Sequence, residues 1–203
     1  IFSLCNYRFS YIEMFFFQAL KGLAFGLVNI FVPIYLYTQG VPLFHIMGAF
    51  TARTALNTVF TLFFVKRILF RLGIKHTFVL TTILYIVSFV VIAQGTALSW
   101  LALWVLIDAF SNALYANAHH TYLTLTIDKR SAGKEVASLY ILMIIMGIIT
   151  PFVGALLILI FGFESMFLVG SVLLLFSTIP LFFSPEIDLS TQTVKHGLSY
   201  VRE

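Results

Sequence analysis

Long apolar stretches alternate with short polar segments along the whole chain. Each of six stretches is close to or above the roughly 20 residues that an α-helix needs to cross the ~30 Å hydrocarbon layer of a membrane. Apolar residues do not recur at every second position, so the pattern favours helices over transmembrane strands. It predicts an all-α membrane protein whose six-helix bundle occupies residues 1–184. The spans are expected at about 14–38, 43–65, 77–95, 98–119, 136–161 and 165–184.

Turn-forming residues separate these stretches. Glycine and proline occur together at Gln39–Pro42, and glycine also marks the breaks at 95–96 and 162–163. Pro185 ends the sixth stretch, because proline cannot continue a helix. The polar stretch 185–203 is too short and too polar to cross a membrane. We interpret it as a cytoplasmic linker, and we expect the chain to be a fragment of a longer protein.

The composition argues against a water-soluble core. The 203 residues are 61% hydrophobic and 10% charged, whereas soluble domains average about 45–50% apolar and about 25% charged residues. The sequence has no nucleophile elbow, zinc-protease motif or phosphate-binding loop, so we expect no enzyme activity, no metal site and no cofactor. The pI of about 9.3 reflects basic residues in short turns. The lipid bilayer is therefore the expected partner, and nucleic acid is not.

Basic residues are distributed unequally between the two sides of the predicted bundle. Assigning the connections alternately to two sides places ten of the 12 Lys and Arg residues on one side. That side comprises the N-terminal flank, the turns at 66–76 and 128–135, and the tail, whereas the turns near 39–42, 95–98 and 162–164 contain none. Positive residues favour the cytoplasmic side. Both termini are therefore predicted to be cytoplasmic, in the inner or plasma membrane of the cell.

Three charged residues, Lys21, Arg53 and Asp108, lie well inside predicted spans. Unpaired and facing lipid, they would together cost roughly 8–10 kcal/mol on insertion scales, so they are expected to face protein or water. A rise of 1.5 Å per residue places all three near the middle of the membrane. One interpretation is a structural ion pair of Asp108 with Lys21 or Arg53. Two cations and one anion leave a positive charge over, which favours a water-filled pathway for a small solute with an anionic group.

Polar residues near these charges follow helical faces. Their spacing of three, four or seven positions places them on one face of the first, second and fourth spans. These spans are expected to line the pathway, whereas the third and sixth look lipid-facing and the fifth is undecided. The faces comprise Gln18, Lys21 and Asn29; His45, Arg53, Asn57 and Thr61; and Asp108, Ser111, Asn112, Tyr115 and His119. The candidate substrate or proton pathway consists of Lys21, Asn29, Arg53, Asn57, Asp108, Asn112 and Tyr115.

Two further short patterns predict structure rather than chemistry. Gly22-x3-Gly26 has the small-residue spacing of a close helix contact. The adjacent side chains of His119 and His120 diverge by about 100° around a helix, so they are interpreted as interfacial residues rather than as a metal-binding pair.

The turn after the second span carries half of a known motif. The pattern G-x3-D-R-x-G-R-[RK] aligns with KRILFRLGIKH at 66–76, where Arg71, Gly73 and Lys75 match and Phe70 replaces the acid. In the fifth span, TPFVGA is similar to a G-P-x-x-G-G element, although a proline kink explains it equally well. With the six spans and the basic turn, these motifs resemble the N-terminal six-helix half of a major facilitator superfamily transporter.

This resemblance implies a fold and a function. It implies two six-helix halves, each built from three-plus-three inverted repeats, with the binding site near the midplane between the halves. The chain would then be half of a secondary active transporter, with proton coupling as a candidate and with Arg71, Gly73 and Lys75 in a cytoplasmic gating loop. A C-terminal six-helix half would be its partner. An alternative from a different functional class is a six-helix channel or assembly subunit that works as an oligomer. Its intramembrane charges would then form structural ion pairs.

Overall fold

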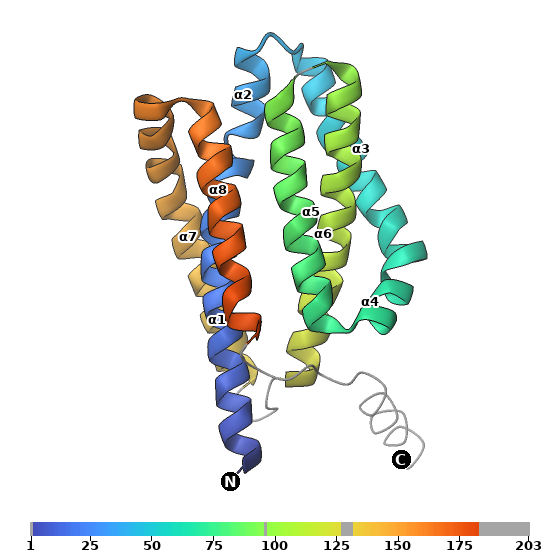
Figure 1. Ribbon diagram of the computed structural model, residues 1–203, viewed down its shortest axis with the longest axis vertical. Helices are drawn as coiled ribbons and strands as arrows, with labels where there is room; N and C mark the ends of the chain where they lie inside the picture. The colour runs from blue at the N-terminus through green and yellow to red at the C-terminus, as the bar shows by residue number, and fades with distance from the viewer. Residues whose placement is uncertain (1, 96, 127–131, 183–203) are drawn as a thin grey trace.

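The computed structural model describes residues 2–95, 97–126 and 132–182 (Figure 1). All regular structure in these residues is helical, as the sequence predicts. The helices are α1 (Phe2–Asn29), α2 (Val32–Thr38), α3 (Leu43–Phe60), η1 (Thr61–Val65), α4 (Lys66–Leu72), α5 (Ile74–Gln94), α6 (Leu98–Thr126), α7 (Ala132–Phe161), α8 (Phe163–Thr178) and η2 (Ile179–Phe182). The predicted linker 185–203 lies outside the described residues.

Two of the predicted spans are interrupted helices. The first consists of α1 and α2, which are separated by a turn at Ile30 and Phe31, with Pro33 in the first turn of α2. The second runs from α3 through the π-helical turn η1 into α4. Only Gly73, with φ of +81°, separates α4 from α5. A side chain is disfavoured at that φ, so glycine suits this tight turn.

The connections alternate between the two ends of the bundle (Figure 1). The start of α1, the turn between α4 and α5, the end of α6 and the end of α8 lie at the lower end of the view. The turns from α2 to α3, α5 to α6 and α7 to α8 lie at the upper end. The basic 66–76 turn thus lies at the opposite end from the three turns that lack Lys and Arg. This alternation is the one on which the predicted orientation depends.

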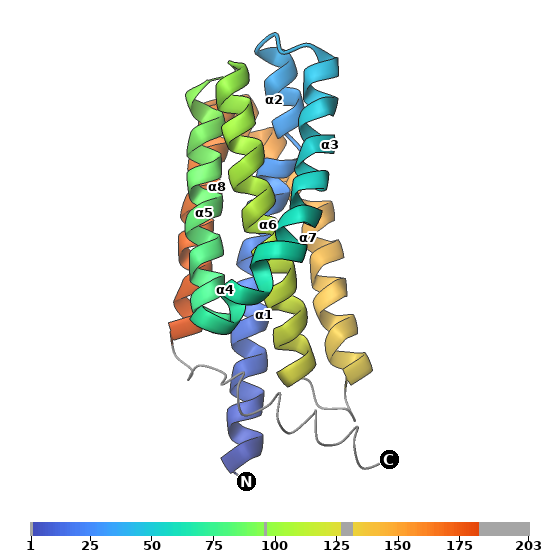
Figure 2. The same cartoon turned by 90° about the vertical axis from the view of Figure 1, so that its right-hand side faces the viewer.

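The helices form two similar groups of three. α1 packs between α7 and α8, while α6 packs in the same way between α3 and α5, and α5 contacts α8 where the groups meet. Figure 2 shows the two groups after a quarter turn. Exchanging the first three spans with the last three therefore preserves these main contacts, but not the further contact that α7 makes with α8. We find no matching sequence repeat, because packing restricts which positions are apolar or small more than it restricts their identity.

Five helical segments of the described chain are long and apolar enough to cross a membrane. They are Ile12–Thr38, Ile74–Gln94, Leu98–Leu125, Gly133–Phe161 and Phe163–Leu181. The predicted second span, 43–65, is helical but is not among them. Its polar residues His45, Arg53 and Asn57 dilute the hydropathy that α3 would otherwise have. The count of six spans therefore remains a prediction.

The prediction for the third span needs a correction. We expected this span to face lipid, but α5 is half buried, more than any other candidate span, and its inner face carries the buried polar residues Thr81, Thr82 and Ser88. The undecided fifth span, α7, is instead the most exposed, with 11% of its most apolar window buried. The sequence misled us because hydropathy reports how apolar a helix is, and not which neighbours cover it.

Close packing against α1 depends on glycine. A Cβ added to Gly26 would lie 2.7 Å from Thr150 Cβ on α7, and one added to Gly170 of α8 would lie 2.6 Å from Val28 Cγ2. At Gly22 the nearest atoms are 3.6 Å away, on Met146. The close contact predicted for Gly22-x3-Gly26 is therefore made mainly by Gly26, and it holds α1 against α7.

Candidate functional site

A buried ion pair joins α3 to α6. Arg53 Nε donates a hydrogen bond to Asp108 Oδ2, and Ser88 Oγ on α5 donates to Asp108 Oδ1 over 3.4 Å. Asp108 is 1% exposed, whereas the side chain of Arg53 is 22% exposed. The sequence left open whether Lys21 or Arg53 pairs with Asp108, and the structure assigns that role to Arg53.

Lys21 lies in a cage of aromatic rings between α1, α5 and α6. Its ammonium lies over the ring of Tyr115, and its Nζ is 5.0 Å, 5.1 Å and 6.0 Å from the ring centroids of Phe25, Tyr85 and Phe17. No described residue accepts a hydrogen bond from this buried Nζ. Cation–π contacts are worth about 0.5–2 kcal/mol each, so the rings offset part of the cost of burying the charge.

The three charges are not placed alike. Arg53 and Asp108 are in direct contact, whereas Lys21 lies against Tyr115, which follows Asp108 by seven positions on α6. Seven residues correspond to about 10 Å along a helix. Lys21 therefore occupies a subsite next to the ion pair, towards the end of the bundle that carries the basic turn.

Amide and phenol groups form hydrogen bonds around the Lys21 cage. Tyr85 hydroxyl donates to Asn112 Oδ1 over 3.3 Å, and Tyr115 hydroxyl donates to Gln18 Oε1. Gln18 Nε2 in turn lies 3.4 Å from Met143 Sδ of α7. The predicted pathway residues Asn112 and Tyr115 thus both adjoin Lys21 or its cage.

The other predicted pathway residues lie further from the charges. Asn57 follows Arg53 by one turn on α3, and its buried Oδ1 has no hydrogen-bond partner among the described residues. Asn29 is the last residue of α1, at the break before α2, and it is only partly buried. Among the described residues, His119 Nε2 is likewise buried without a partner, and its ring stacks on Tyr115 with centroids 5.6 Å apart. Polar groups therefore follow α6 from Asp108 towards its C-terminal end.

The basic turn does not present all its charges outward. Arg71 is exposed, but Lys75 is 7% exposed and forms an ion pair with Glu13 of α1 at 3.8 Å. Lys75 Nζ also donates to Leu181 O over 3.3 Å. Of the three residues assigned to a gating loop, Lys75 thus ties α5 to α1 and η2, and Gly73 makes the turn.

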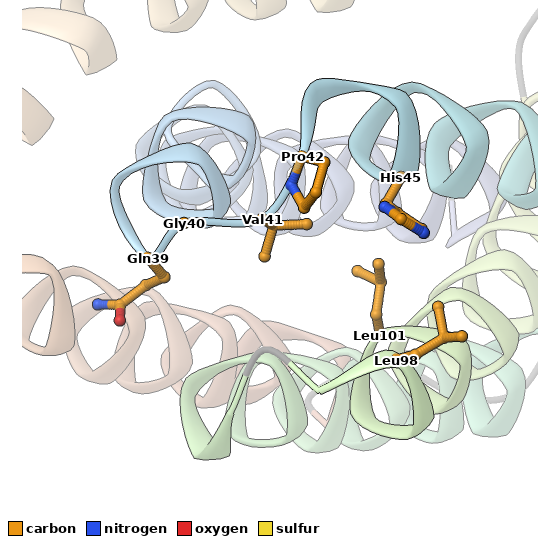
Figure 3. A pocket seen from close by; sticks show the side chains of 7 residues that line it. All are labelled: Gln39, Gly40, Val41, Pro42, His45, Leu98 and Leu101. Carbon is orange, nitrogen blue, oxygen red and sulfur yellow. The ribbon is translucent and has the colours of Figure 1, made fainter.

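A pocket of about 240 Å³ opens at the other end of the bundle, between the α2–α3 turn and the start of α6. Figure 3 shows Pro42 and His45 facing Leu98 and Leu101 across it. Its lining combines apolar side chains with Gln39 and His45, and His45 precedes Arg53 by eight positions on α3, about 12 Å along the helix. The pocket is therefore separate from the charged residues.

In the described ranges, no group of three or more His, Cys, Asp and Glu side chains could hold a metal ion. His119 and His120 have ring centroids 5.8 Å apart and planes inclined at 64°. This geometry agrees with the divergence expected from adjacent helical positions.

The protein is thus a helical bundle with a buried ion pair and a lysine enclosed by aromatic rings in its interior. The sequence model of the Major Facilitator Superfamily matches residues 14–199. The chain belongs to this family. Family members are transporters rather than enzymes, and the chain is accordingly a multi-pass membrane protein with a role in transport. Its length fits the N-terminal half that the resemblance implies. Comparison with curated proteins gave no match.

Sequence reasoning missed the contribution of α5 and the rings around Lys21. Tyr85 and Ser88 both come from the span expected to face lipid, and Phe17 and Phe25 were not considered. One signal was available, because Tyr85 and Ser88 are three positions apart and therefore share a helical face. The aromatic rings gave no such signal, since phenylalanine is abundant throughout the chain, at 23 residues.

Proposed function

We propose that this chain is the N-terminal half of a secondary active transporter that moves a small solute by alternating access. In such a mechanism two six-helix halves rock about a central site. Membership of the family supports the general role. The buried Arg53–Asp108 ion pair between α3 and α6 supports the specific mechanism, because a charge pair in a low-dielectric interior is expensive to retain without a role.

In this proposal Asp108 is the switch. Arg53 holds it in the present arrangement, and Lys21 lies nearby without an acceptor among the described residues. When the site opens to the other side, Asp108 exchanges Arg53 for Lys21 or for a proton. Each arrangement keeps the carboxylate of Asp108 neutralised, so neither state leaves a bare negative charge in the interior.

The decisive experiment is uptake by the intact protein in proteoliposomes, with Asp108→Asn as the variant. We expect at least a ten-fold loss of uptake and loss of its pH dependence, because asparagine can neither ionise nor compensate Arg53. Glu164→Gln is a matched control, since Glu164 is an exposed acid in the first turn of α8. Unchanged, pH-dependent uptake by Asp108→Asn would remove Asp108 from the mechanism.

The proposal includes an orientation with both termini in the cytoplasm of a cell whose inner or plasma membrane holds the protein. The one-sided distribution of Lys and Arg supports it. After Cys5→Ser, a cysteine at exposed Arg71 should react with a membrane-impermeant maleimide only from the cytoplasmic side, and one at exposed Gln39 only from outside. Labelling with the opposite sidedness would reject the orientation.

A second six-helix half is the proposed partner. Large apolar side chains remain exposed along η1 and α7, including Phe63 at 72%, Phe152 at 71% and Leu159 at 82%. Lipid and the helices of a second half can cover these apolar surfaces. Leaving them in contact with water would be unfavourable in free energy. Cysteine cross-linking between residues on α3 and the second half of the intact protein would test the arrangement.

A further inference from the structure

We infer that the transported solute is a small organic anion whose negative charge is neutralised by Lys21. This inference rests on the proposed transport function and specifies its substrate class. The charged residues of the described helices are mostly paired with one another or lie near helix ends. Arg53 and Asp108 neutralise each other, and Glu13 pairs with Lys75. The remaining described acids, Glu135 and Glu164, lie in the first turns of α7 and α8. The nearby Asp108 attracts Lys21 but is already paired with Arg53, so no described carboxylate forms an ion pair or hydrogen bond with Lys21.

The surroundings of Lys21 offer its ammonium no hydrogen-bond acceptor among the described residues. An ammonium has three donors, yet the buried Nζ of Lys21 meets ring faces instead of acceptors among the described residues. Buried donors without acceptors are rare in folded proteins and costly. An anionic oxygen would provide both the acceptor and the missing negative charge. A neutral solute would leave the charge in place, and a cationic one would be repelled.

The aromatic rings around Lys21 determine how a solute could approach its ammonium and what shape of solute they favour. Of the four rings around Lys21, Phe17 and Tyr85 are buried, whereas Phe25 and Tyr115 are partly exposed. The cage therefore lies at the margin of the packed interior, with Tyr115 held over the ammonium by its bond to Gln18. A solute reaches Lys21 by displacing the Tyr115 ring, and a flat apolar body then packs on the rings. A carboxylate on such a body fits this subsite.

Three probes of nearly equal size test the charge requirement: benzoate, benzamide and benzylammonium. Binding is measured calorimetrically on the full-length protein in lipid nanodiscs. We expect benzoate to bind at least ten-fold more tightly than benzamide, with no binding of benzylammonium. Lys21→Met should remove the advantage of benzoate, Lys21→Arg should retain it, and Lys66→Met, an exposed lysine of α4, should not change it. Equal behaviour of the three probes, including no binding of any, would overturn the inference.

The stability of the ligand-free protein is a second, independent readout. If Lys21 serves an external anion, Lys21→Met removes an uncompensated charge, and the Tm should stay the same or rise. A Tm several degrees lower would mean that Lys21 is a structural partner within the protein, and would overturn the inference.

Uptake of radiolabelled benzoate into proteoliposomes separates the two proposals. Charge-selective binding without uptake would reject transport by this protein while the anion site stands. Uptake of solutes with no preference for negative charge would support transport and reject the anion.

Discussion

Breaking the ion pair between α3 and α6 should destabilise the protein asymmetrically, depending on which partner is removed. Asp108 is 1% exposed, and without Arg53 the one hydrogen bond left among those described for its carboxylate is the 3.4 Å bond from Ser88. Removing one partner of a buried ion pair costs about 3–5 kcal/mol, and an uncompensated charge in mid-membrane about 2.5–3.5 kcal/mol. We therefore expect Arg53→Met to lower the free energy of unfolding by about 3 kcal/mol.

Asp108→Asn should cost less. The side chain of Arg53 is already 22% exposed, so it can turn towards water when its partner is neutral, and we expect a loss of about 1 kcal/mol. The double variant Arg53→Met/Asp108→Asn leaves no charge to compensate. It should recover about 2 kcal/mol relative to the sum of the single losses, which is within the range measured for residues in contact.

Reversible unfolding of the full-length protein in bicelles by sodium dodecyl sulfate gives the four free energies of this cycle. Arg71→Met is the control, because Arg71 is an exposed arginine of α4 and should change stability by less than about 0.5 kcal/mol. A coupling energy below about 0.5 kcal/mol, or a larger loss for Asp108→Asn than for Arg53→Met, would refute this reasoning.

Two further predictions concern packing and the basic turn. Gly26→Ala should lower the free energy of unfolding by about 1–3 kcal/mol, because its Cβ would lie 2.7 Å from Thr150 Cβ, whereas Gly147→Ala on α7 meets nothing within 4 Å and should be neutral in the same unfolding assay. Lys75→Met should destabilise by about 3 kcal/mol through the buried Glu13 carboxylate, and Lys75→Met/Glu13→Gln should recover part of that loss in thermal unfolding. Equal losses for the two glycine variants, or no recovery in the double variant, would contradict these contacts.

Much of the candidate site could be anticipated from single residues. An ionisable residue in an apolar span is conspicuous, and its cost in the membrane requires a partner or water. Lys21, Arg53 and Asp108 could therefore be selected without coordinates, and the structure brings all three into the interior or its margin. The sequence could not decide whether Lys21 or Arg53 is the partner of Asp108. Both side chains are long, so either could reach Asp108 from the depth that the predicted spans give it.

The roles of α5 and Lys75 depended on packing. The buried polar side chains in the middle of α5, Thr81, Thr82, Tyr85 and Ser88, carry hydroxyl or phenol groups. Such groups are inexpensive in a membrane helix and so give a weak signal. Lys75 matches a loop motif, yet its side chain turns inward to Glu13, which lies 62 positions earlier in the sequence. Contacts of this kind depend on the relative rotation of two helices, and no local pattern records that rotation.

The sequence by itself determined that the chain is helical, that it enters a membrane and where its turns lie, because hydrocarbon penalises every unpaired backbone group and every bare charge wherever they occur. The tertiary structure alone decided which helices are neighbours, which cation holds Asp108 and which rings surround Lys21. The physical reason is the range over which each interaction acts. Transfer into hydrocarbon acts on each residue independently, whereas pairing and packing act only between side chains that the fold brings within a few ångströms.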